Sequence, residues 1–350
     1  MRKVFLFFLL LIFFINPVFA FTLNEKIGQM LIVGFEGNDV HSSFSKKSLK
    51  RIKKGEVSGI ILFSKNIKSK EDLIEMNEKI LNSNSITPFI SIDNEGGVIQ
   101  RYDFYQHKSA KEVSNLTNLQ AKEEYSKMAQ LEKELKINFN FAPCVDLGIN
   151  PSSIIVKKQR SYSNNYKIVT NYSKIFIDEH SKNNIITSIK HFPGHGSVKG
   201  DTHLGFVDAT STFQKQELEP YIELANYNKT NTVMVSHIFN KNFDEQYPAS
   251  LSKKTIDFLK NDIGFNGVIV SDDYDMRAIR DNYSLRDIIV NSINSGINIL
   301  IFSNNISKKD ENLPRKFRKI VKKELKKGNI KIKDIDESFN KIIELKKNLI

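Results

Sequence analysis

The chain has 350 residues, a formal net charge of +12 at pH 7 and one cysteine, Cys144. A single cysteine excludes an intramolecular disulfide, and its apolar surroundings favour a small buried side chain over a nucleophile. A positive net charge is common in proteins that bind nucleic acid. No nucleic-acid-binding motif accompanies it in this sequence, so no such partner is expected.

Residues 1–20 have the order of a secretory signal peptide. Arg2 and Lys3 precede an apolar run at residues 4–15, and Ala20 supplies the small residue before the expected cut. We therefore expect a bacterial protein exported to the periplasm or the medium, without stable membrane insertion after cleavage. An uncleaved N-terminal anchor is the alternative, although the run is short for a membrane span.

Residues 21–350 contain eight short apolar runs typical of strands, most of them separated by amphipathic helical segments such as residues 70–81, 121–135 and 253–262. The predicted strands span residues 29–35, 58–63, 88–93, 138–146, 185–191, 232–237, 267–272 and 297–302. This alternation predicts an α/β fold in which a parallel sheet closes into a (β/α)8 barrel of the TIM type. An open doubly wound sheet is the alternative, but no glycine-rich dinucleotide loop supports it. Because no linker-like segment interrupts residues 21–350, we expect one domain.

Much of the positive charge lies in residues 306–350, which contain 15 Lys and Arg against 7 Asp and Glu. Phe317, Ile320, Val321 and Leu325 recur there at helical spacing, so the basic side chains lie on the outer face of a helix. A solvated helix face is the favoured interpretation, and attraction to an anionic polymer such as a cell wall is the alternative.

Polar side chains terminate five of the predicted strands. They are Asp93, Asp146, Lys190 with His191, Ser236 with His237, and Ser271 with Asp272 and Asp273. In a barrel the carboxyl ends of the strands build the active site. Since unpaired buried charges are costly, so many polar strand ends predict such a site.

Two elements indicate bond cleavage at a sugar. Asp272 at a strand end can attack an anomeric carbon and form a covalent glycosyl-enzyme, although a helix N-cap is the alternative for this residue. The acid/base candidate is His203 in a glycine-rich loop, with Asp201 two residues earlier to orient it. Considered alone, these two residues fit an exposed loop histidine and a turn aspartate equally well.

The sequence resembles the β-N-acetylhexosaminidases of glycoside hydrolase family 3 along nearly all of residues 21–350. The motifs that carry the resemblance are IDNEGG at 92–97 with Gln100 and Arg101, NFAP at 140–143 with Asp146, QRSY at 159–162, KHFPGHG at 190–196 with Asp201 and His203, MVSH at 234–237, PASLS at 248–252, GFNGVIVSDD at 264–273 and IDES at 335–338.

The resemblance implies that Asp272 is the nucleophile, that His203 is the acid/base and that Asp201 is its partner on a mobile loop. It implies that the side chains holding the terminal sugar are Asp93, Arg101, Arg160, Lys190 and His191. His195 receives no role beyond support of the loop.

The implied reaction is the exo-acting release of terminal β-linked N-acetylglucosamine from peptidoglycan or chitin fragments. It proceeds with retention of configuration and without a metal or another cofactor. The expected partner is this carbohydrate substrate, and the expected oligomeric state is a monomer.

Three residues depart from the family pattern. Val98 stands where Arg is common, and Thr202 stands where Ser is usual. Asp275 stands where a small hydroxyl residue is frequent, and its charge would raise the pKa of Asp272 if the two carboxyls were close.

Two other functions remain open at this point. One is a β-glucosidase or β-xylosidase of the same family, although those enzymes generally lack the Asp-x-His pair and take their acid/base from a further domain. The other is a catalytically inactive barrel that binds cell wall through its basic surface.

Overall fold

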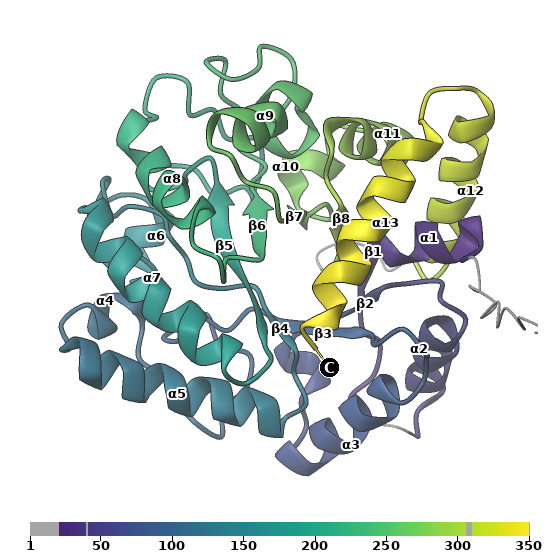
Figure 1. Cartoon of the computed structure of the whole chain (residues 1–350), viewed down its shortest axis with the longest axis horizontal. Helices are drawn as coiled ribbons and strands as arrows, with labels where there is room; N and C mark the ends of the chain where they lie inside the picture. Colours follow the sequence, from purple (N-terminus) through teal and green to yellow (C-terminus); the bar gives the residue numbers. More distant parts are fainter. Residues whose placement is uncertain (1–20, 40, 306–309, 350) are drawn as a thin grey trace, which may run out of the picture.

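The computed structural model describes residues 21–39, 41–305 and 310–349, and it shows a closed parallel barrel inside a layer of helices (Figure 1). The strands are β1 (Leu31–Gly34), β2 (Gly59–Leu62), β3 (Phe89–Ile92), β4 (Phe139–Asn140), β5 (Ile186–Phe192), β6 (Thr232–Val235), β7 (Val268–Asp273) and β8 (Ile299–Phe302). Each strand pairs with the next, and β8 pairs with β1 to close the barrel. The predicted (β/α)8 barrel is confirmed, and the open-sheet alternative is wrong. The expected signal peptide lies outside the described residues.

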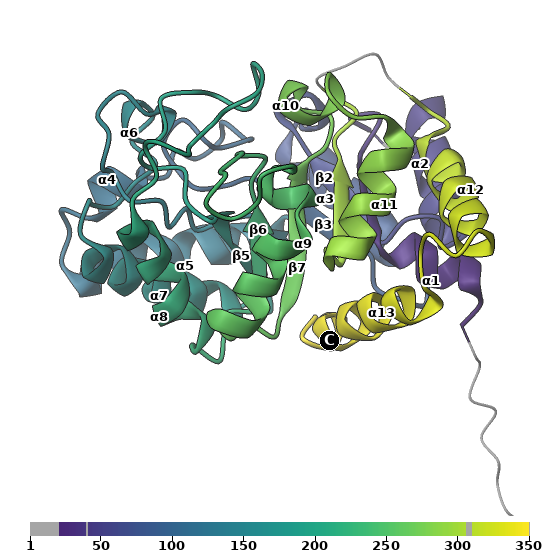
Figure 2. The same ribbon diagram turned by 90° about the horizontal axis from the view of Figure 1, so that it is seen from above.

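Helices follow most strands and cover the outside of the barrel. They are α1 (Leu23–Gln29), α2 (Ser43–Lys53), α3 (Lys70–Leu81), α4 (Ala110–Val113), α5 (Asn118–Glu134), α6 (Ile154–Lys157), α7 (Tyr166–Ser181), α8 (Glu219–Ala225), α9 (Lys253–Asp257), α10 (Arg277–Arg280), α11 (Leu285–Ser295), α12 (Leu313–Lys326) and α13 (Ile332–Lys347). Figure 2 shows α13 across one end of the barrel and α10 at the opposite end. In the part of the chain that the structure describes, no helix combines the length and the apolar character needed to cross a membrane.

The predicted helix at residues 70–81 coincides with α3. Helix α5 begins three residues before the predicted start at 121, because Thr117 caps it in a reciprocal hydrogen-bonded pair with Gln120. The segment predicted as one helix at 253–262 is α9 followed by a π-helical turn at Phe258–Asp262.

The predicted strand at residues 138–146 is regular only at β4, which is two residues long. Pro143 has no N–H to donate, so a continuous ladder cannot pass through it. The chain nevertheless stays beside β5, because Val145 N donates to Lys190 O at 2.8 Å. This course brings Asp146 next to His191 without a regular strand.

A buried carboxylate on α5 holds the loop that follows β3. Glu132 Oε1 accepts hydrogen bonds from Asn94 Nδ2 at 2.7 Å and from Asn140 Nδ2 at 2.8 Å. Asn140 also pairs with the backbone of Asn94, accepting from its N–H at 3.1 Å and donating to its carbonyl at 2.9 Å. The loop that carries Asp93 is therefore fixed from inside the helical layer.

The other oxygen of Glu132 lies 3.4 Å from His180 Nε2, and both side chains are fully buried. His180 Nδ1 lies 2.8 Å from Phe176 O, which can only accept, so this nitrogen carries a hydrogen. Glu132 and His180 therefore lie side by side, fully buried, between α5 and α7.

Replacing Glu132 with alanine should destabilise the protein by about 2–6 kcal/mol, because the buried amides of Asn94 and Asn140 lose the one oxygen that accepts from both. Replacing it with glutamine should cost less than about 1 kcal/mol, because the amide oxygen can accept from both asparagines. Urea unfolding of the three proteins measures the difference. Equal losses for alanine and glutamine would show that these hydrogen bonds are not what stabilises the loop.

Candidate active site

The carboxyl ends of three strands bring most of the predicted site residues to one end of the barrel. Asp93 follows β3, Lys190 and His191 lie in β5, and Asp272 lies in β7. Neighbouring strands of a closed parallel barrel all end on the same face, so residues far apart in sequence meet there.

Four of the five predicted sugar-holding residues form one network of charges. Lys190 Nζ lies 2.8 Å from Asp93 Oδ1 and 2.8 Å from Glu95 Oε1. Arg101 Nη2 lies 3.0 Å from Asp93 Oδ2, and Arg160 binds both oxygens of Glu95 at 2.8 and 2.7 Å. Glu95 is the residue that joins the two halves of this network.

The network keeps its carboxylates ionised. Burial acts to raise the pKa of Asp93 and Glu95, but the charges of the neighbouring cations outweigh it. Lys190 and Arg101 lower the pKa of Asp93 far below its usual range, whereas Arg160 and Lys190 lower that of Glu95 to about 2. These groups therefore hold fixed charges at neutral pH.

His191, the fifth predicted sugar-holding residue, connects this network to Asp146. Its Nδ1 lies 2.7 Å from Asp146 Oδ2, and its Nε2 lies 3.1 Å from Arg160 Nη2. A guanidinium only donates, so Nε2 must accept and Nδ1 must carry the hydrogen that Asp146 accepts. The two neighbours thus fix both the orientation and the tautomer of the ring.

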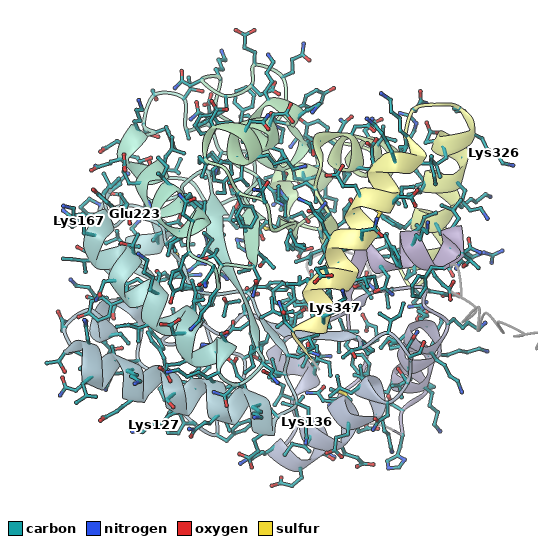
Figure 3. All side chains as sticks on the ribbon, viewed as in Figure 1. Lys127, Lys136, Lys167, Glu223, Lys326 and Lys347 are labelled. Atoms are coloured by element: carbon teal, nitrogen blue, oxygen red, sulfur yellow. The ribbon has the colours of Figure 1, made fainter. Side chains whose placement is uncertain are left out.

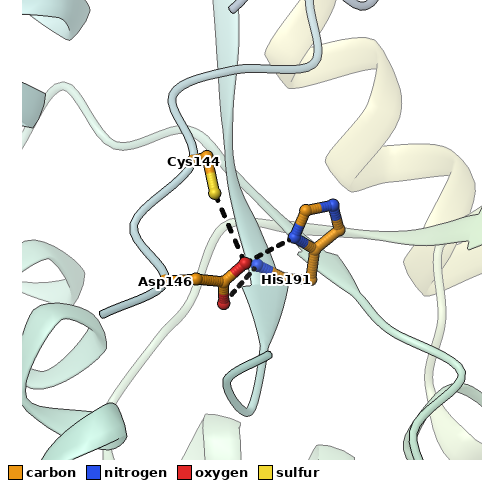
Figure 4. Close-up of side chains that lie close together, drawn as sticks. All are labelled: Cys144, Asp146 and His191. Carbon is orange, nitrogen blue, oxygen red and sulfur yellow. Dashed lines mark hydrogen bonds and ion pairs between the residues drawn. The ribbon is translucent and has the colours of Figure 1, made fainter. Parts of the chain in front are cut away.

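Cys144, Asp146 and His191 lie close enough to raise the question of a metal site (Figure 4), with their ligand atoms within 4.8 Å of one another. Thiolate, carboxylate and imidazole are ligands of zinc. A metal on His191 Nδ1 would, however, move the ring hydrogen to Nε2, where it would face an Arg160 donor. Burial and the charge of Asp146 also raise the pKa of Cys144, so its thiol keeps the hydrogen that it donates to Asp146 at 3.3 Å. The hydrogen-bond pattern therefore opposes metal binding at this cluster.

Two buried carboxylates fix the start of the loop between β5 and β6. Asp146 Oδ1 accepts from His195 N at 2.8 Å, and Glu217 Oε2 accepts from the N–H groups of Gly196 and Ser197 at 2.8 and 3.2 Å. A side chain at Gly196 would place its Cβ 1.8 Å from Leu147 O, so only glycine fits. Burial lowers the pKa of His195 to about 4, which makes it a neutral ring at this anchored base, as expected for a loop support.

Asp201 and His203 lie further along the same loop. His203 Nδ1 lies 2.8 Å from Asp201 Oδ1, and the His203 side chain is 58% exposed. Their hydrogen bond lowers the pKa of Asp201 to about 2 and, with the charge of Asp272, raises the pKa of His203. Thr202 O accepts from Ala278 N at 3.2 Å, which ties the loop to the segment after β7.

Asp272 is an ionised carboxylate at the end of β7. Burial acts to raise its pKa, but the imidazoles of His237, His191 and His203 lower it below its ordinary value. The N-cap alternative is wrong, because Asp272 lies within the strand and Met276 caps the following helix α10.

The structure shows where the departures at Asp275 and Val98 lie. The pKa of Asp272 is lowered overall, while Asp275 accepts from Asn304 N and its charge adds to burial in raising the pKa of Asp273. Val98 is 68% exposed and lines a rim cleft of about 810 Å³ with Arg101, so it offers no polar contact there.

Sequence reasoning counted Asp146 among the polar strand ends of the site but gave it no role, and it did not assign Glu95, Glu217 or Glu132 to the site. Glu95 had a signal, since it lies two residues after Asp93. Glu217 and Glu132 had none, because their helical, polar surroundings are typical of exposed positions.

Comparisons with known proteins identify the family of this chain. The model of the glycosyl hydrolase family 3 N terminal domain matches residues 22–345. A β-hexosaminidase of Haemophilus influenzae is 31% identical over 265 residues, which are 71% of this chain and 73% of the relative. A protein described as an uncharacterized secreted glycosyl hydrolase, from Arthroderma benhamiae, is 27% identical over 95% of this chain and 96% of its own length.

Solved structures show the same fold. A family 3 β-N-acetylglucosaminidase from a Paenibacillus species has a TM-score of 0.86 at 24% identity and covers 94% of this chain and 63% of its own. A β-N-acetylhexosaminidase from Beutenbergia cavernae has a TM-score of 0.84 at 19% identity and covers 94% of this chain and 99% of its own. The chain belongs to glycosyl hydrolase family 3, as a glycoside hydrolase related to its β-N-acetylhexosaminidases.

Proposed function

We propose that the protein is an exo-acting, retaining β-N-acetylhexosaminidase that releases terminal β-linked N-acetylglucosamine from peptidoglycan or chitin fragments. The observation that carries this proposal is the Asp201–His203 pair, whose side chains lie 2.8 Å apart, together with the carboxylate of Asp272 in β7, which interacts electrostatically with His203. The relatives named β-hexosaminidase support the substrate class.

The charged network would hold the terminal sugar. Asp93 accepts from sugar hydroxyls, while Lys190, Arg101 and Arg160 donate to sugar oxygens. Among the described residues none accepts a hydrogen bond from the buried Arg101 Nε, so this donor suits a substrate oxygen. His191 completes the pocket with its fixed ring.

The first displacement uses Asp272 and protonated His203. Asp272 attacks the anomeric carbon while His203 gives its proton to the departing glycosidic oxygen, so the leaving sugar departs as a neutral alcohol. Asp201 accepts a hydrogen bond from the ring throughout and stabilises its protonated form.

The second displacement reverses the proton transfer. Neutral His203 takes a proton from water, the water oxygen attacks the anomeric carbon, and the bond to Asp272 breaks. The product leaves with its original configuration, and His203 is again protonated for the next cycle.

We also propose that the protein is exported and that residues 1–20 are removed as a signal peptide. The relative described as secreted, which matches 95% of this chain, supports this localisation.

The Asp272→Ala variant should lose measurable turnover, because no other group can form the glycosyl-enzyme. The His203→Ala variant should be slower by about 10²–10⁴-fold. Its loss should be larger with chitobiose than with p-nitrophenyl β-N-acetylglucosaminide, because the phenolate leaves without protonation. Exposed Asp262→Ala is the control, and a His203→Ala variant of normal activity would refute the acid/base assignment.

The pH profile should reveal the Asp201–His203 pair. Since protonated His203 is the acid, kcat/KM should fall as pH rises through a pKa above the ordinary value of 6.5. The Asp201→Asn variant loses the negative charge that raises this pKa, so its alkaline limb should move to lower pH. Exposed Asp208→Asn should leave the profile unchanged. An unshifted limb in Asp201→Asn would separate Asp201 from the proton transfer.

Two substrate comparisons decide among the candidate functions. p-Nitrophenyl β-N-acetylglucosaminide should be cleaved faster than the corresponding β-glucoside, and the reverse order would favour the glucosidase alternative. Product analysis with purified cell-wall and chitin oligomers should show single N-acetylglucosamine units released from chain ends. Retention on cell wall without any turnover would favour the non-catalytic barrel.

A further inference from the structure

The helix α12 carries a stripe of cations on its outer face. It buries Leu313, Phe317 and Val321, as its apolar spacing predicts. We call five exposed residues of this helix the basic stripe; they are Arg315, Lys319, Lys322, Lys323 and Lys326. They lie one, three or four residues apart, and none of them forms an ion pair with any residue that the structure describes.

The basic stripe is one continuous surface. Its five side chains, together with Arg318 and Lys327, line a single shallow hollow of about 580 Å³. Glu56, which follows α2 in the chain, pairs with Arg318 of α12 at 3.7 Å, and α2 itself contains five cations and no anion. Like charges three or four residues apart weaken a helix, whereas Lys323 and Lys326 lie in the last turn of α12, where cations are favourable.

The described chain begins beside this stripe. Helix α1 packs against α12 and α13, and Lys322 Nζ lies 3.3 Å from Asn24 Oδ1. The ring of Phe21 packs on that of Phe339 with centroids 4.9 Å apart. The first described residues therefore lie at the edge of the basic face.

We propose that the basic stripe is a docking surface for an anionic phospholipid bilayer. The charge of the stripe complements anionic headgroups, which attract clustered Lys and Arg side chains near a bilayer surface. No large apolar side chain of α12 is exposed, so the contact is electrostatic and sensitive to salt. The enzyme thus lies with the side of its barrel, at α12, against the membrane.

The test uses residues 21–350, because the closed barrel and its core lie within the described residues. The variant Lys319→Gln/Lys322→Gln/Lys326→Gln removes three charges from the basic stripe. The matched control, Lys122→Gln/Lys127→Gln/Lys133→Gln, removes three exposed charges from α5. The labels of Lys127 on α5 and Lys326 on α12 in Figure 3 show that the two helices lie on different sides of the molecule. Thermal unfolding of each protein verifies that it is folded. Neither this measurement nor vesicle binding requires enzyme activity, so the test does not depend on the proposed activity.

Sedimentation with vesicles gives the readout at low salt. The unchanged protein should bind vesicles of phosphatidylcholine with phosphatidylglycerol but not vesicles of phosphatidylcholine alone. The α12 variant should bind at least about tenfold more weakly, while the α5 variant should bind as the unchanged protein does. Equal weakening in both variants, or no binding to anionic vesicles, would overturn the proposal. Binding to soluble teichoic acid but not to vesicles would also overturn it.

Discussion

The site depends on one fully buried ammonium group. Lys190 lies between Asp93 and Glu95 at 2.8 Å from each, and no other described cation contacts both carboxylates. Buried charges are tolerated only when partners compensate them, so removing Lys190 would leave two carboxylates short of positive charge. The charged network consequently forms only when β5 and the loop after β3 are in place together.

The residues proposed to hold the sugar and the residue proposed to transfer the proton differ in their burial. The sugar-holding charges are buried and bound to one another, so their protonation does not vary near neutral pH. His203 is largely exposed and bound to a single carboxylate, which leaves its proton available for transfer. Burial therefore separates the groups that position the substrate from the group that titrates.

The sequence predicted the barrel because apolar runs are local patterns, and polar strand ends indicated Asp93, Lys190, His191 and Asp272 as candidates for a site. Arg101 and Arg160 were expected only from the family resemblance. The sequence overestimated β4, since the effect of Pro143 on the ladder depends on its neighbour β5. It also missed Glu132, whose burial arises from packing between α5 and α7 and leaves no trace in an otherwise amphipathic helix. The direction of the Asp275 effect could not be predicted either, because the distance from Asp272 depends on the path of the chain after β7.

One carboxylate joins two parts of the site that differ in role. Asp146 orients the ring of His191 through one oxygen and holds the backbone of His195, at the base of the acid/base loop, through the other. A change at this position would alter sugar contact and loop placement at once. A change in the preferred sugar would therefore arise more readily from substitutions around the exposed Val98, whose side chain holds neither the ring of His191 nor the loop backbone.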